Sequence, residues 1–139
     1  PSVFTLSMQC AANYFSARQA PDLDVDVPAG TQDAEYLSLL ADHLPRVFRT
    51  VRPSLTFFQA GCDPHEDDAL GKLRLSREGL RARNRLVYRA ALEFDSPVVV
   101  TMGGGYPRDL NVDSAPFETV VQCHADVYRD CVAIAQELV

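Results

Sequence analysis

The sequence has 139 residues, a formal net charge of -6 and a hydrophobic content of 47%. This length suits a single domain with a substantial core, and the composition excludes a disordered or fibrous chain. The acidic balance argues against nucleic acid as the main ligand, because such a ligand requires a basic surface.

The first part of the chain is predicted to contain two strands and then helices. Residues 3–8 form a short apolar, β-rich run. Leu23, Val25 and Val27 alternate with aspartates, which is typical of a half-exposed edge strand. Residues 31–44 have the apolar spacing of a helix, and Pro45 is expected to open a second, short helix.

A strand, a helix and another strand are predicted to follow. Residues 54–60 form the strand, and Ser76 is expected to cap a helix that runs to about Phe94. We expect the arginines of this helix to form a solvated face; they are Arg81, Arg85 and Arg89. Residues 97–102 are apolar without alternation, which is typical of a strand buried on both faces.

The last predicted helix covers residues 114–138. Its apolar stripe is expected to face the core; the stripe comprises Phe117, Val120, His124, Tyr128, Cys131, Ala135 and Leu138. On this basis His124 is interpreted as a core histidine and not as a ligand. The order of strands and helices predicts an α/β fold with parallel pairing, in which ligands bind beyond the carboxyl ends of the strands.

The loop after the strand predicted at residues 54–60 is rich in potential cation ligands. Between Asp63 and Asp68 it contains four carboxylates and the imidazole of His65. Hard and borderline cations prefer such groups, although a solvated charged loop has the same composition. Asp63 follows the strand most closely, so its carboxylate is expected to point toward the cleft at the strand end.

The loop after residues 97–102 contains Gly103, Gly104 and Gly105, followed by Tyr106. It lacks the last glycine of a dinucleotide-binding fingerprint and the ending of a Walker loop. Glycines allow a close approach to the backbone, and a phenol at a strand end can donate a hydrogen bond to a carbonyl oxygen or an oxyanion. An ordinary turn remains the alternative.

Considered together, the two loops resemble a known family. The stretch FFQAGCDPHEDDALGKLRLS, residues 57–76, is similar to the arginase/deacetylase superfamily, with the best match to class IV histone deacetylases and their bacterial relatives. The resemblance implies the C-terminal portion of a three-layer α/β fold, in which a parallel sheet is flanked by helices. Residues 1–139 would then be the C-terminal part of one histone-deacetylase-like domain, with its N-terminal part absent.

The same resemblance implies functions for individual residues. Asp63 matches a zinc ligand, Asp68 a supporting acidic residue and Tyr106 the catalytic tyrosine. Leu70 matches a residue that lines the acyl tunnel, and Gly104 and Gly105 belong to the glycine loop at the substrate. Less directly, Ser7 and Met8 match residues that help to hold a structural monovalent cation such as potassium.

The expected reaction is hydrolysis of acetyl-lysine or a similar N-acyl amide, in a protein or a small molecule. In the family a pair of histidines and two further zinc ligands precede the strand that resembles residues 3–8, and this chain has only His43, His65 and His124. Tight zinc sites use three or four protein ligands, so we expect the isolated chain to be inactive and to need the other half of the domain as a partner.

Two alternatives remain from the sequence alone. One is a non-catalytic remnant that binds a partner, and the other is an unrelated α/β module, such as a flavodoxin-like receiver, with Asp63 as its acidic site. No apolar run reaches the roughly 18 residues of a membrane span, and the four cysteines lack zinc-ribbon spacing. We therefore expect a cytoplasmic protein with reduced thiols that acts away from membranes.

Overall fold

The computed structural model describes residues 3–13 and 19–137. Two parallel pairs of strands form the sheets. β1 (Leu6–Cys10) pairs with β2 (Leu23–Val27), and β3 (Thr56–Gln59) pairs with β4 (Val98–Thr101). The predicted α/β class with parallel pairing is confirmed. The strands form two separate two-stranded sheets.

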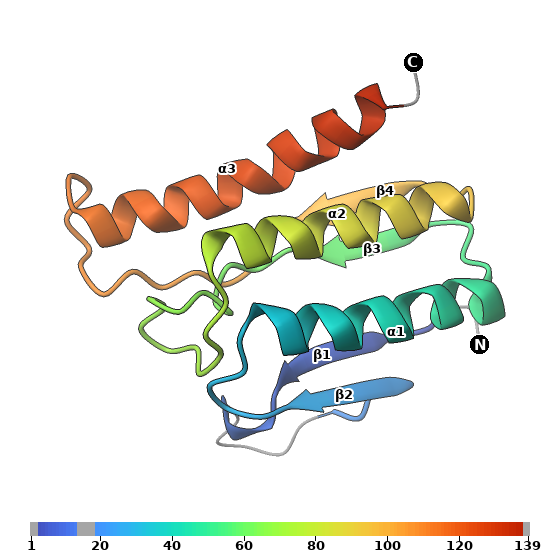
Figure 1. The fold of residues 1–139 in the computed structure, drawn as a ribbon, viewed down its shortest axis with the longest axis horizontal. Coiled ribbons are helices and arrows are strands. Elements are labelled where there is room, and N and C mark those ends of the chain that lie inside the picture. The colour runs from blue at the N-terminus through green and yellow to red at the C-terminus, as the bar shows by residue number, and fades with distance from the viewer. Residues whose placement is uncertain (1–2, 14–18, 138–139) are drawn as a thin grey trace.

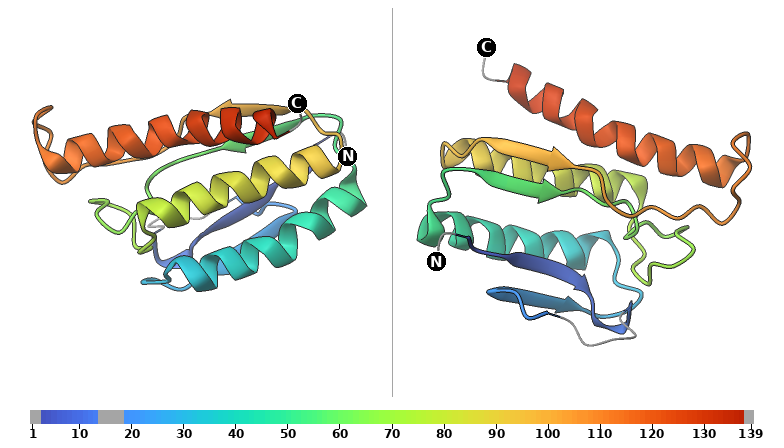
Figure 2. Two further views of the ribbon diagram at one scale, coloured as in Figure 1. Left: turned by 45° about the horizontal axis from the view of Figure 1, so that its top comes forward. Right: turned by 180° about the vertical axis from the view of Figure 1, so that it is seen from behind.

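Three helices cover the sheets. They are α1 (Asp33–Val51), α2 (Arg77–Glu93) and α3 (Ala115–Gln136), and a short 3-10 turn, η1 (Ala11–Asn13), follows β1. α1 lies over the β1–β2 pair and α2 over the β3–β4 pair, while α3 runs beside α2 (Figure 1). Seen from behind, the strands lie in front of the helices, so α1 and α2 share one side of the sheets (Figure 2).

This one-sided arrangement corrects the expectation for residues 97–102. In β4, partly buried residues alternate with exposed ones, and Val99 is 41% exposed. Its partner in register, Phe57 of β3, is 70% exposed. The prediction of a strand buried on both faces was wrong because helices of the described chain cover only one face of this pair.

α1 is longer than predicted. The sequence suggested a break at Pro45, but the helix continues through it to Val51. Its buried residues recur every four positions, at Tyr36, Leu40, Leu44 and Phe48, and the ring of Phe48 stacks on Phe94 with centroids 5.7 Å apart. Packing on both sides of the proline therefore outweighs the missing backbone hydrogen bond.

The start of α2 is fixed by the side chain predicted for it. The Ser76 hydroxyl accepts a hydrogen bond from the Gly79 amide at 3.0 Å, which caps the helix. The same hydroxyl donates to Asp33 in the first turn of α1 at 2.6 Å. This hydrogen bond thus joins α1 and α2 at their N-terminal ends.

The arginines of α2 form an interface and not a solvated face. Asp130 of α3 is 0% exposed and accepts hydrogen bonds from Arg81 at 3.1 Å and Arg85 at 3.0 Å. Arg89, in contrast, pairs with an exposed partner, Glu137. The predicted solvated face was therefore wrong for Arg81 and Arg85, because α3 covers them with a buried carboxylate.

The buried face of α3 also differs from the predicted stripe. Its buried residues are Cys123, Asp126, Val127, Asp130 and Ile134. Tyr128 of the predicted stripe is 47% exposed, and Leu138 lies outside the described residues. Among the residues described, no helix is both long and apolar enough to cross a bilayer.

Candidate active site

The loops that follow β3 and β4 lie side by side. Backbone hydrogen bonds continue past the strand ends, from the Ala60 amide to the Thr101 carbonyl at 3.0 Å and from the Cys62 amide to the Gly104 carbonyl. The loop that carries Asp63 is therefore connected directly to the loop that carries Tyr106. This meeting of the two strand-end loops is what a parallel sheet predicts.

Two glycines make room for the Asp63 carboxylate. A Cβ atom at Gly61 would lie 2.6 Å from Asp63 Oδ1, and one at Gly104 would lie 2.7 Å from the same oxygen. The latter would also lie 3.1 Å from Cε2 of the Tyr106 ring. The Asp63 carboxylate and the Tyr106 ring therefore both border Gly104, where any larger residue would collide with them.

Asp68 connects the two loops through its side chain. It is 3% exposed, and its Oδ1 accepts the backbone amides of Leu70 at 2.9 Å and Gly71 at 2.6 Å. Its Oδ2 accepts the amide of Tyr106 at 2.7 Å. A hydrogen bond from the Ala69 amide to the Tyr106 carbonyl, at 2.9 Å, completes the connection. Asp68 thus has the structural environment of a supporting residue.

The Asp63 carboxylate is partly buried and therefore partly desolvated. Burial raises the pKa of its carboxyl above the usual value, and the negative charge of Asp68 adds to this effect. The positive charge of Arg83 and the imidazole of His124 act in the opposite direction. A carboxylate in such a setting gains from a bound cation, because a cation replaces the lost hydration.

His124 lies at the site and not in the core. Its Nδ1 is 3.4 Å from the Cys62 thiol, and a Cβ atom at Gly105 would lie 3.0 Å from its Nε2. Burial, followed by the charge of Arg83, lowers the pKa of His124, while Asp63 opposes this shift. The interpretation of His124 as a core histidine was wrong because α3 is rotated relative to the predicted stripe.

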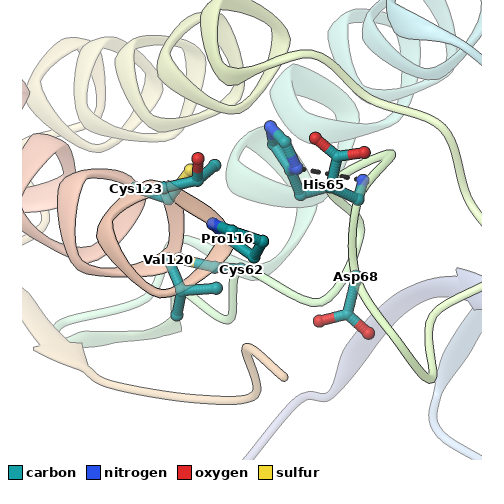
Figure 3. A pocket seen from close by; sticks show the side chains of 8 residues that line it. Cys62, His65, Asp68, Pro116, Val120 and Cys123 are labelled. Atoms are coloured by element: carbon teal, nitrogen blue, oxygen red, sulfur yellow. Dashed lines mark hydrogen bonds between the residues drawn. The ribbon is translucent and has the colours of Figure 1, made fainter. Parts of the chain in front are cut away.

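A small pocket lies behind the Asp63 loop, against the start of α3. It is lined by Cys62, Asp68, Pro116 and Cys123 among others (Figure 3). His65 also borders it and is 7% exposed, with its Nδ1 accepting the Asp67 amide at 3.1 Å. His65 is thereby bound to its own loop. A hydrogen bond with Cys123 and then burial raise the pKa of Cys62, whose neutral thiol fits this enclosed place.

The other predicted site residues are Leu70, in the same loop as Asp68, and Ser7 and Met8, on β1. Leu70 is 63% exposed, and its carbonyl accepts a hydrogen bond from Asn13 of η1 at 3.3 Å. Ser7 and Met8 lie on β1, opposite Asp24 and Val25 of β2. They lie in the β1–β2 sheet, whereas Asp63 lies in the loop that follows β3 of the other sheet.

Arg83 is a further residue at the site, and its position in the sequence carries a signal. The buried face of α2 includes Leu80, Val87 and Ala91. Arg83 and Asn84 lie on this same face, one helical turn after Leu80 and one turn before Val87. Polar residues at an apolar step of a helix indicate a buried polar contact. The Arg83 Nη1 donates to the Gly61 carbonyl at 2.6 Å.

The metal implied by the resemblance does not fit this set of groups alone. Among the described residues, no cluster of three or more histidine, cysteine, aspartate or glutamate side chains could hold a metal ion. Asp63 supplies one carboxylate, whereas zinc in proteins has three or four protein ligands.

A family model for the histone deacetylase domain matches residues 8–121, which include both loops and most of the described elements. The chain belongs to the histone deacetylase family. This membership rules out an unrelated receiver-like α/β module.

Two curated relatives match most of this chain. An uncharacterized protein of Picosynechococcus sp. is 43% identical over 111 residues, which are 80% of this chain and 37% of that protein. Histone deacetylase 2 of Arabidopsis thaliana is 37% identical over 94 residues, which are 68% of this chain and 24% of that protein. The chain of this histone deacetylase family member therefore spans only 37% and 24% of the length of these two relatives.

The fold is similar to that of an HDAC homolog solved in complex with SAHA. The TM-score is 0.60 at 23% identity, over 88% of this chain and 35% of the other. The predicted portion of the arginase/deacetylase fold is confirmed by this likeness.

Proposed function

We propose that this chain forms part of the active site of a zinc-dependent deacetylase that hydrolyses acetyl-lysine or a similar N-acyl amide. The observation that carries the proposal is the meeting of Asp63 and Tyr106 at Gly104. A carboxylate and a phenol at one cleft supply a cation ligand and a hydrogen-bond donor for a polarised carbonyl. Family membership supports the same chemistry.

In this proposal each residue has a defined task. Asp63 is one zinc ligand, and Tyr106 donates its phenol proton toward the substrate carbonyl and the oxyanion that forms from it. Asp68 orients both loops, while Leu70 and the backbone at Gly104 and Gly105 border the acyl group. The remaining zinc ligands come from residues that are not among those described, because the described set holds no complete site.

Further parts of the proposal concern the setting of this site. Residues 1–139 form the C-terminal part of a single domain, which is most similar to class IV and bacterial deacetylases and functions in the cytoplasm. The substrate is an acylated protein or a small-molecule amide. Ser7 and Met8 contribute to a potassium site near β1.

The test uses the protein as its source produces it, compared with this chain alone. We expect the source protein to release acetate from an acetyl-lysine peptide, to lose that activity with a zinc chelator and to regain it with added zinc. We expect the isolated chain to show no turnover with zinc. Turnover by the chain alone would contradict the need for further ligands. A source protein that is inactive when loaded with zinc would favour a non-catalytic remnant instead.

A further inference from the structure

Arg83 is a buried cation, and within the described part of the chain its hydrogen bonds end on neutral groups. It is 5% exposed, and its guanidinium donates to the Gly61 carbonyl at 2.6 Å and to the Asn84 side-chain oxygen at 3.0 and 3.3 Å. The guanidinium carbon lies 5.5 Å from the ring centroid of Phe58. Burying a charge is costly, and an apolar side chain of similar size would fill this space at a lower desolvation cost.

The other arginines of α2 provide the contrast. Arg77, Arg81, Arg85 and Arg89 each pair with a carboxylate of α3 or the residue after it. These pairs explain their positions by the contact between α2 and α3. Arg83 points instead toward the end of β3, where the loop of Asp63 begins.

Arg83 holds the backbone at a place that is crowded on its other side. A Cβ atom at Gly61 would lie 2.6 Å from Asp63 Oδ1 and 3.1 Å from the Gly104 amide nitrogen. Gly61 is therefore enclosed between the Arg83 guanidinium on one side and the Asp63 carboxylate and the glycine loop on the other. A shift of the Gly61 carbonyl would move Asp63 relative to the glycine loop.

The direction of the guanidinium is itself fixed from both sides. Phe58 of β3 packs against its face, and the Asn84 side-chain oxygen accepts hydrogen bonds from its Nε and Nη2. Asn84 is 1% exposed, and its amide nitrogen lies 3.5 Å from the buried carboxylate of Asp130. The Asp130 carboxylate is in turn held by Arg81 and Arg85. A hydrogen-bonded network thus connects α3 to the Asp63 loop through Arg83.

We propose that Arg83 is a positioning residue, which holds the Gly61 carbonyl and thereby sets the place of the Asp63 carboxylate relative to Tyr106. The catalytic meaning of this placement rests on the deacetylase function proposed above. The hydrogen bonds and packing of Arg83 are independent of that function. The proposal can therefore be tested without metal or substrate.

The test is amide hydrogen exchange on this chain and three variants. Arg83→Met keeps an unbranched side chain against Phe58 but removes the donors to Gly61. We expect exchange at the Cys62 and Tyr106 amides to become at least about tenfold faster, which corresponds to the loss of roughly one hydrogen bond. The amide of Leu40 in α1 should keep its protection. Arg89→Met, on the exposed side of α2, is the matched control and should leave the Cys62 and Tyr106 amides unchanged.

Arg83→Lys distinguishes positioning from a general contribution to folding. Lysine keeps the charge and one donor direction, so it should restore part of the protection at Cys62 and Tyr106. Equal acceleration across all elements, unchanged exchange in Arg83→Met, or failure of both variants to fold would overturn the proposal. In the source protein, Arg83→Met should lower kcat with little change in KM. If that protein has no deacetylase activity, the function fails while the exchange result still decides the positioning.

Discussion

The carboxylate of Asp68 accepts the backbone amide of Tyr106 at 2.7 Å, across 38 residues of sequence. Its other oxygen accepts two amides of its own loop. One buried side chain therefore sets the distance between the loop of the proposed metal ligand and the loop of the proposed catalytic phenol.

Asp68→Asn should weaken both the fold and the proposed activity. An amide has one acceptor oxygen, so its NH2 group must face at least one of the backbone donors. We expect the free energy of unfolding to fall by about 1–3 kcal/mol in urea denaturation. Asp67→Asn, at the exposed neighbouring carboxylate, is the control and should change it by less than about 0.5 kcal/mol. Equal stability of the two variants would contradict the bridging function of Asp68.

Tyr106→Phe should separate activity from stability. The Tyr106 side chain is 47% exposed, so loss of its hydroxyl should leave the melting temperature nearly unchanged. If the phenol stabilises an oxyanion, kcat of the source protein should fall by about 10²–10³-fold on an acetyl-lysine peptide. A variant that keeps full turnover would show that another group donates this hydrogen bond.

Asp130→Asn should destabilise the chain far more than a matched exposed change. Asp130 is fully buried and accepts hydrogen bonds from Arg81 and Arg85. Those arginines keep some contact with water, so we expect a loss of about 2–4 kcal/mol in denaturant unfolding. Glu137→Gln breaks the exposed pair with Arg89 and should cost less than about 1 kcal/mol. Similar losses for the two variants would contradict this ranking.

The pH dependence of stability should contain a contribution from Asp126. Burial acts to raise its pKa, but hydrogen bonds from Arg77 and Arg129 outweigh burial and lower the pKa below its usual value. The folded state then binds a proton less readily than the unfolded state. The stabilisation is therefore complete above the unfolded pKa of about 3.9 and is lost as the pH falls through the lowered folded value.

This dependence is measurable with Asp126→Asn. At pH 7 the variant should be less stable than the parent chain by about 1–3 kcal/mol, and the difference should shrink below pH 4. A difference that stays constant from pH 7 to pH 2 would mean that packing, and not charge, explains the loss.

The sequence predicted the site more accurately than it predicted the packing, because the site predictions relied on local patterns. The Ser76 cap, the alternation around Val25 and the order of the two loops are local features, so the corresponding predictions held. The meeting of Asp63 and Tyr106 followed from the rule that parallel strands end at the same edge.

The errors came from contacts between distant residues. A hydrophobic stripe on α3 could not reveal that its buried face contains Asp126 and Asp130, because their burial depends on arginines 45 to 49 residues away on α2. The continuity of α1 through Pro45 depends on packing against Phe94, another long-range contact.

The same division of contacts has a consequence for how the molecule comes apart. α1 and α2 meet mainly through apolar side chains, whereas the contact between α3 and α2 includes the buried Asp126 and Asp130, which pair with arginines of α2. Protonation of Asp126 removes the charge that pairs with Arg77 of α2, whereas the apolar contact between α1 and α2 has no charge to lose. Acid should therefore release the C-terminal helix before the rest of the fold opens, and with it the His124 side chain that faces the candidate site.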